Sequence, residues 1–404
     1  MLLPVIAGAI LAFTYLVIAI GRAPFLRIDR TGAAIVGATL MIASGVISLD
    51  EAYQHIDFRT LVLLFGMMVV IAHLRMARFF TAVVRWVGTR IHDPKLLLVA
   101  VVFVSGILSA LFVNDTICLV FTPVLIELAE ARGHRPLPYL LALATASNIG
   151  SVATITGNPQ NMLIASVSHI GYVPFVSALG PIALFGLALD AAVLTLMFRA
   201  DLRPGPMEYA GRGPRPLHRA MMTKALLVSA GVMVALLMGQ DPALVAAIGA
   251  AALLITRRVH PEKVYRSIDW DLLVLFVGLF VVIGGVERIG LASRLFDILA
   301  PAGLHTTTGL TIVTAILSNV ISNVPAVMLL SKLIPHLPDP SSAWLTLAMS
   351  STLAGNLTLV GSIANLIVLQ GARRHNVEIT FWEYAKVGLP VTVATIMFGV
   401  WWLA

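Results

Sequence analysis

The chain has 404 residues, of which 59% are hydrophobic and only 12% are charged, and its mean hydropathy is +0.94. Soluble domains carry about 25% charged residues, so this composition excludes an ordinary soluble protein. The net charge of +7 does not indicate nucleic-acid binding, because the basic residues lie in short connections between apolar segments, where they orient membrane helices. A single cysteine, Cys118, excludes an internal disulfide and a multi-thiol metal site within one chain.

Long apolar segments recur along the whole chain, and several reach the roughly 20 residues that a helix needs to cross a bilayer. In chain order they are 1–21, 31–49, 60–72, 96–126, 136–168, 170–189, 225–240, 242–256, 272–286, 298–331, 342–372 and 387–404. The first segment lacks a basic leader and a small-residue cleavage site, so we expect it to be a retained helix. The sequence therefore predicts an all-α polytopic protein of the cell inner membrane.

The chain contains an internal repeat. Residues 56–71 (IDFRTLVLLFGMMVVI) and 268–283 (IDWDLLVLFVGLFVVI) are identical at nine of sixteen positions, at an offset of 212. Three further pairs of asparagines align at nearly the same offset: Asn114 with Asn323, Asn148 with Asn356, and Asn161 with Asn365. Apolar composition alone would not keep polar residues in register, so we interpret the pattern as a duplication.

The two copies are expected to have opposite orientations in the membrane. The loop 22–30 holds three arginines and its counterpart 239–242 holds none, whereas the acidic loop 50–58 corresponds to the basic loop 257–267. Such a reversed charge bias is typical of inverted repeats in secondary transporters. With the N-terminus outside, the basic residues that do not fall on the cytoplasmic side are Arg59, Arg288, Arg294 and Lys332.

The repeats divide the chain into a first inverted repeat at 1–198, a cytoplasmic linker at 199–224 and a second inverted repeat at 225–404. Each repeat is expected to contain a re-entrant hairpin. The segment at about 96–131 has basic residues beyond both ends, and its second arm has about ten uncharged residues, too few to span a bilayer. We expect this hairpin to enter from the cytoplasm and its counterpart at about 309–335 to enter from outside.

An interrupted transmembrane helix follows each hairpin. Glycine, asparagine and proline break the apolar span 144–165, and glycine and asparagine break the span 353–368. These breaks free backbone groups that need partners inside the protein or in a water-filled cavity. Helix N-termini favour anions and free carbonyls favour cations. A kink that serves packing is the alternative, but two breaks at matching places, each beside a polar hairpin tip, favour a binding site.

Asp115 lies at the first hairpin tip and is the only charged residue between Leu96 and Ile126. An ionised carboxylate alone in the membrane is costly, so we expect it to be protonated, or paired with a cation or substrate, for much of a transport cycle. A role as a helix cap is the alternative. Asp190 has no obvious partner in the sequence, and a second protonation site and an interhelical hydrogen bond both remain open for it.

The blocks FVNDTICLVFTPVL, TGNPQN, SNVPAVMLL and GSIANLIV resemble those of the ion transporter superfamily, in particular arsenite permeases and their anion-permease relatives. The resemblance covers nearly the whole chain. It implies that the hairpin tips and helix breaks surround the substrate and the coupling ion. The residues that match these positions are Asn114, Asp115, Thr116, Asn148, Thr154, Gly157, Asn158, Asn161, Ser322, Asn323, Asn356, Thr358, Gly361, Ser362 and Asn365.

We therefore expect a secondary transporter that exports arsenite or antimonite in exchange for protons, with Asp115 as the proton-coupling group. Arsenite near neutral pH is an uncharged trihydroxide, which suits a pocket of amides, hydroxyls and backbone groups. A carrier of small anions such as dicarboxylates, coupled to sodium or protons, is the alternative, and a channel-like conduit fits broken helices less well. The sequence has no metalloprotease, nucleophile-elbow or P-loop motif, so we expect no enzyme activity, cofactor or resident metal.

The expected partners are the small inorganic substrate, membrane lipid and a second copy of the chain in a homodimer. If the chain is an arsenite permease, the resemblance also implies a cytoplasmic ATPase subunit.

The inverted topology can be tested by labelling. Single cysteines placed in the loops 50–58 and 257–267 of a Cys118→Ser variant should react with an impermeant maleimide from opposite sides of the membrane, because the charge bias of these loops is reversed. Labelling of both loops from one side would contradict both the inversion and the hairpin assignment.

Overall fold

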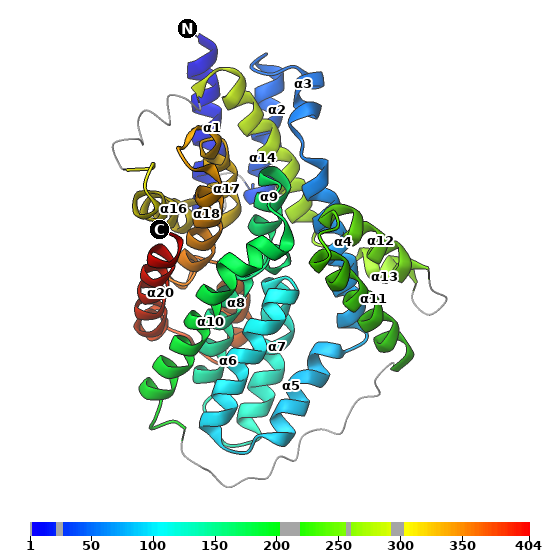
Figure 1. Ribbon diagram of the computed structural model, residues 1–404, viewed down its shortest axis with the longest axis vertical. Coiled ribbons are helices and arrows are strands. Elements are labelled where there is room, and N and C mark those ends of the chain that lie inside the picture. The colour runs from blue at the N-terminus through cyan, green and yellow to red at the C-terminus, as the bar shows by residue number, and fades with distance from the viewer. Residues whose placement is uncertain (1, 22–26, 203–218, 256–259, 292–302) are drawn as a thin grey trace.

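The computed structural model describes residues 2–21, 27–202, 219–255, 260–291 and 303–404. These residues form helices joined by short turns, which confirms the all-α class (Figure 1). Most of the predicted linker 199–224 lies outside the described residues.

The helices of the first half of the chain are α1 (Leu2–Ile20), α2 (Arg30–Ala43), α3 (Leu49–His55), α4 (Phe58–Met76), α5 (Phe79–Arg90), α6 (Pro94–Leu111), α7 (Asn114–Glu130), α8 (Leu137–Val152), η1 (Ile155–Gly157), α9 (Pro159–Ser168) and α10 (Tyr172–Met197). Those of the second half are α11 (Arg219–Leu237), α12 (Pro242–Leu254), α13 (Pro261–Tyr265), α14 (Trp270–Arg288), α16 (Thr307–Ile321), α17 (Asn323–Ser331), η3 (Ile334–His336), α18 (Pro340–Ala354), α19 (Ile363–Arg374) and α20 (Phe381–Leu403).

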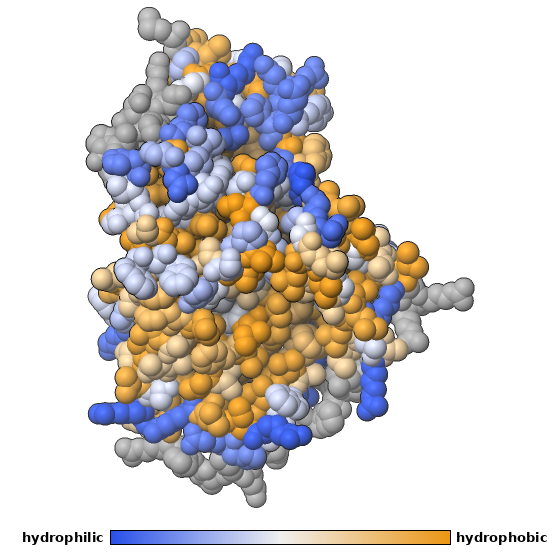
Figure 2. Space-filling view, in the orientation of Figure 1, coloured by the Kyte–Doolittle hydropathy of each residue, from blue (hydrophilic) through white to orange (hydrophobic). Residues whose placement is uncertain are grey.

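The described helices keep one order in both halves, with α1–α4 matching α11–α14 and α6–α10 matching α16–α20. Seven of them are long and apolar enough to cross a membrane: α1, α4, α6, α10, α11, α14 and α20. Figure 2 shows the corresponding apolar band, which lies between hydrophilic surfaces at the upper and lower ends of the view. We call α1–α4 and α11–α14 the frame helices.

Two tight hairpins and two interrupted helices lie at the predicted places. Two residues join α6 to α7, and Ser322 alone joins α16 to α17. The returning arm α7 has 17 residues, longer than the ten expected, because it continues through Glu127 to Glu130. The side from which each hairpin enters the membrane stays a prediction.

The frame is built around two close helix crossings of the same kind. A Cβ atom at Gly66 of α4 would lie 2.7 Å from the backbone carbonyl carbon of Ala246 in α12, and one at Gly278 of α14 would lie 2.7 Å from that of Ala34 in α2. Both residues of the second crossing are related to those of the first by the offset of 212. The repeat found in the sequence is therefore also a repeat of helix packing. Each half of the chain supplies one helix to each crossing.

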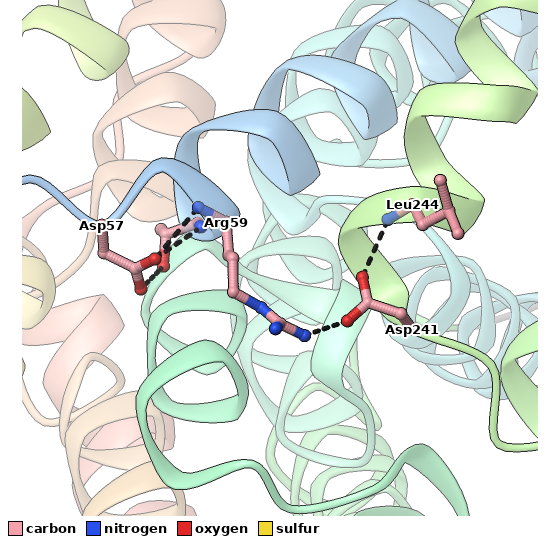
Figure 3. Close-up of polar contacts among 5 residues, drawn as sticks. Asp57, Arg59, Asp241 and Leu244 are labelled. Carbon is pink, nitrogen blue, oxygen red and sulfur yellow. Dashed lines mark hydrogen bonds and ion pairs between the residues drawn. The ribbon is translucent and has the colours of Figure 1, made fainter.

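The ends of these crossings differ between the halves. Arg59 of α4 forms an ion pair with Asp241, whose other carboxylate oxygen accepts a hydrogen bond from the Leu244 amide at 2.9 Å (Figure 3). At the equivalent place Asp271 replaces Arg59, and Thr31 Oγ1 donates to the Asp271 carbonyl at 3.1 Å. The repeat therefore preserves the crossing but not its charges.

The glycine crossings predict a stability effect. Gly66→Ala and Gly278→Ala should each destabilise the fold by about 1–3 kcal/mol, because the added methyl group overpacks a backbone contact. The thermal unfolding midpoint of the purified protein measures this. Gly231→Ala in α11 is the matched control, since nothing lies within 4 Å of its added Cβ. Equal midpoints for all three variants would contradict the close-packing assignment.

Candidate functional site

The first interrupted helix is held open by one asparagine. Asn161, at the start of α9, donates through Nδ2 to the carbonyls of Ser151 (3.1 Å) and Thr154 (2.9 Å). Asn158 caps the same helix by accepting from the Asn161 amide at 2.8 Å. A buried carbonyl without a partner is costly in a membrane, so these bonds make the break stable.

The second interrupted helix repeats this arrangement. Asn365 Nδ2 donates to the carbonyls of Gly355 (2.8 Å) and Thr358 (3.3 Å), and Ser362 caps α19 by accepting from the Ala364 amide at 3.1 Å. Asn365 and both of its carbonyl acceptors lie 204 residues after their counterparts in the first break. The sequence repeat therefore includes the hydrogen bonds that create the breaks.

Both breaks also need a glycine. A Cβ atom at Gly157 would lie 2.2 Å from the Ser151 carbonyl oxygen, and one at Gly361 would lie 2.7 Å from Asn319 Oδ1. These two predicted site residues act by leaving space for close backbone turns.

The contacts between the two breaks correct one alignment made from the sequence. Asn158 Nδ2 donates to Thr352 Oγ1 at 3.2 Å, and Ser362 Oγ donates to Asn148 Oδ1 at 3.1 Å. Since Ser362 is the counterpart of Asn158, Thr352 is the counterpart of Asn148. The pairing of Asn148 with Asn356 is therefore wrong by four residues, about one helical turn.

Asn148 is the centre of a fully buried network that joins the first hairpin tip to the second break. Its Oδ1 accepts from Asn114 Nδ2 at 2.9 Å and from Ser362 Oγ at 3.1 Å. Its Nδ2 donates to Asn356 Oδ1 at 2.8 Å and to Asn365 Oδ1 at 3.2 Å. Five predicted site residues thus meet through one carboxamide, so a change at any of them is transmitted to both repeats.

Most of the remaining predicted residues form hydrogen bonds at the hairpin tips and helix breaks. Thr154 Oγ1 donates to the Ala110 carbonyl, Thr358 Oγ1 donates to Asn319 Oδ1 at 3.0 Å, and Asn323 Oδ1 accepts from Ser318 Oγ at 3.0 Å. Thr116 is half-buried at the first tip. Ser322 adopts φ 74° and ψ 159°, a backbone conformation that is strained for a residue other than glycine.

A cavity of about 40 Å³ lies where the two hairpin tips meet the two breaks. Its wall takes residues from the first turns of α7, α9, α17 and α19, so four helix N-termini and their partial positive charges meet there. The lining residues are Ile18, Arg30, Asn114, Asp115, Pro159, Gln160, Leu272, Leu275, Ser322, Asn323, Val324, Pro325, Ser362 and Ile363. One water needs roughly 10–15 Å³ on this measure, so the cavity holds about three waters or one small solute.

Three polar residues of this region were not predicted from the sequence. Arg30 and Gln160 line the cavity. Tyr384 of α20 accepts from Asn365 Nδ2 at 2.7 Å and donates to Asn356 Oδ1 at 3.3 Å. The repeat could have indicated Tyr384, because it lies 212 residues after Tyr172, whose hydroxyl is 3.4 Å from Thr156 Oγ1.

Asp190 is connected to the network from the side of α10. Its Oδ2 accepts from Thr145 Oγ1 at 2.8 Å, and the Thr145 carbonyl accepts from Asn356 Nδ2 at 2.9 Å. Asp190 is fully buried, and its Oδ1 has no hydrogen-bond partner within the described residues. The partner that the sequence did not reveal is therefore Thr145, on the neighbouring helix α8.

A buried polar site formed by two sets of broken helices, inside an apolar helical protein, defines a membrane transporter. The chain belongs to the citrate transporter family (CitMHS), whose sequence profile matches residues 15–354. This agrees with the predicted resemblance to the ion transporter superfamily. The protein is a secondary transporter and a multi-pass protein of the inner membrane.

Named relatives span nearly the whole chain. It is 34% identical over 449 residues to the silicon efflux transporter LSI3 of Oryza sativa subsp. japonica, with 93% of each chain covered. It is 30% identical over 421 residues to a 46 kDa membrane protein of Mycobacterium leprae, covering 97% of this chain and 96% of that protein. It is 25% identical over 492 residues to the putative transporter arsB of Dictyostelium discoideum, covering 93% of this chain and 87% of that protein.

The fold is also similar to a solved one. The crystal structure of the Alcanivorax borkumensis YdaH transporter matches with a TM-score of 0.61 at 16% identity, covering 100% of this chain and 96% of that chain. At this identity the likeness supports the fold alone.

The central position of Asn148 gives a prediction. Asn148→Ala should lower both transport and the thermal unfolding midpoint, because it leaves the buried side chains of Asn114 and Ser362 without an acceptor, at about 1–3 kcal/mol each. Gln370→Ala is the matched control, since it removes an exposed carboxamide from α19. Normal transport by a stable Asn148→Ala protein would show that the network does not hold the site.

Proposed function

We propose that the protein exports arsenite, antimonite or a similar uncharged metalloid hydroxide in exchange for protons. The observation that carries this proposal is the cavity, in which helix starts and amide and hydroxyl side chains surround a space next to the carboxyl of Asp115.

The chemistry of the cavity wall suits a small polyhydroxide. The hydroxyl oxygens of such a solute accept hydrogen bonds from the helix N-termini and from carboxamide groups such as that of Gln160. Its hydroxyl hydrogens need acceptors, which the carboxylate of Asp115 and the hydroxyl of Ser322 provide. The volume of about 40 Å³ supports a solute of few atoms.

Two relatives support the same class of solute. One is named a silicon efflux transporter and another a putative transporter arsB. Dissolved silicon near neutral pH is an uncharged tetrahydroxide, and arsenite is an uncharged trihydroxide. A site that holds hydroxyl groups by donors and acceptors together serves both.

The isolation of Asp115 supports the proposed coupling to protons. Its own amide donates to Asn114 Oδ1 at 3.0 Å, but within the described residues no hydrogen bond reaches its carboxyl. When ionised, the carboxylate accepts a hydroxyl hydrogen from the solute; when protonated, it loses that acceptor site. Solute and proton therefore compete for one group, and such competition produces exchange rather than leak.

The alternative is a sodium- or proton-coupled carrier of small anions such as dicarboxylates. The family name and the four helix N-termini favour an anion. The carboxylate of Asp115 repels one, however. The homodimer and the ATPase partner remain predictions of the superfamily resemblance.

Transport in everted membrane vesicles tests this function. Vesicles with an acidic interior should accumulate arsenite, and sodium should have no effect. Asp115→Asn should still bind arsenite but lose pH-driven accumulation at least tenfold, because the group no longer titrates. Asp50→Asn, which neutralises an exposed acid of α3, should behave as the wild type. Sodium-driven uptake of citrate or succinate without arsenite uptake would establish the alternative.

A further inference from the structure

Arg30 is a cation in the cavity wall that belongs to neither hairpin nor break. It is the first residue of α2, a frame helix, and it is half-buried. Within the described residues its guanidinium has neither a hydrogen bond nor an ion pair. Two other arginines of the frame are paired, since Arg59 contacts Asp241 and Arg288 Nε lies 2.9 Å from Glu51 Oε1. The guanidinium of Arg30 is therefore free to bind a ligand.

Arg30 and Asp115 are the two charged residues among those that line the cavity. They do not form an ion pair with each other. An unpaired charge in a low-dielectric space is costly, and two opposite charges across such a space attract strongly. A solute that forms hydrogen bonds with both groups at once offsets the cost of both unpaired charges.

Two other carboxylates belong to the surroundings of Arg30 and Asp115. Asp269, the N-cap of α14, is a like charge near Asp115, and its carboxylate accepts a hydrogen bond from the Leu272 amide at 3.0 Å. Asp29 precedes Arg30 and accepts from the Gly32 amide at 2.8 Å. The helices α9 and α17, which also meet at the cavity, contain no titratable residue. Arg30 is therefore the cation among the residues that line the cavity.

We propose that Arg30 is the substrate-positioning and specificity-determining residue on the frame side of the site. Its planar guanidinium donates to the hydroxyl oxygens of the solute while Asp115 accepts from a hydroxyl hydrogen on the opposite side. The solute then bridges a frame helix and a hairpin. This assignment rests on the proposed function for the identity of the solute, but not for the action of Arg30 on Asp115.

The proposal also explains how proton competition is adjusted. A guanidinium across a small cavity favours the ionised form of Asp115, so solute binding persists at lower pH than an isolated buried carboxyl would allow. Without Arg30, the proton should displace the solute at higher pH.

Binding of arsenite to the purified full-length protein, measured across a pH series, tests this. Arg30→Gln should weaken arsenite binding about tenfold or more and move its loss on acidification to higher pH, because one charge-assisted hydrogen bond disappears. Arg30→Lys should retain part of the affinity, since it keeps the charge but not the planar fork. Arg27→Gln is the matched control, because it removes an exposed charge near the same end of α2.

Infrared titration of the Asp115 carboxyl band distinguishes the action of Arg30 on Asp115 from the identity of the solute. The band is assigned by its disappearance in Asp115→Asn. In Arg30→Gln the protonated band should persist to higher pH, whatever the solute. If the wild type binds no arsenite but this band still moves, the proposed solute fails and the action of Arg30 stands. Unchanged arsenite binding together with an unchanged band would overturn the inference.

If Arg30→Gln does not fold, Arg30→Lys decides. Equal arsenite binding by Arg30→Lys and the wild type, with an unchanged Asp115 band, would also overturn the inference.

Discussion

The structure depends on one constraint, that every backbone group freed inside an apolar protein must find a partner. The two helix breaks would each leave carbonyls unsatisfied, and Asn161 and Asn365 each satisfy two of them with one carboxamide. Because these bonds keep the breaks open, four helix N-termini can meet at one cavity instead of continuing as two unbroken spans. The candidate site therefore depends on the hydrogen bonds that satisfy these carbonyls.

The site itself is less symmetric than the fold that holds it. Gly66 and Gly278 make the same crossing, and both breaks use the same hydrogen bonds. At the hairpin tips, however, Asp115 corresponds to Val324, and at the frame Arg30 corresponds to Pro242. Both charges of the cavity thus come from the first repeat. The fold around the cavity is therefore repeated, whereas its two charged residues belong to one half of the chain.

The network around Asn148 explains how events at one side of the cavity are transmitted. Its carboxamide bonds to the first hairpin tip through Asn114 and to the second break through Asn356 and Asn365. The Thr145 carbonyl extends this network to the buried Asp190. A shift of the hairpin on binding or release of a proton would therefore change hydrogen bonds in both repeats, because buried networks of this kind have few alternative partners.

The sequence by itself determined the membrane class, the duplication, the hairpin tips and the helix breaks, because these depend on composition, spacing and the local effects of glycine, proline and asparagine. It also marked Asn114, Asp115, Ser322, Asn323 and Ser362, which the structure places in the cavity wall. Only the tertiary structure decided which distant groups meet. Contacts between different helices show that Thr352, and not Asn356, is the counterpart of Asn148 in the second repeat. Such contacts also determine the hydrogen bond between Thr145 and Asp190 and the position of Arg30 at the cavity. Helix packing determines such contacts to within one helical turn, whereas a hydropathy pattern does not distinguish two alignments that differ by one turn.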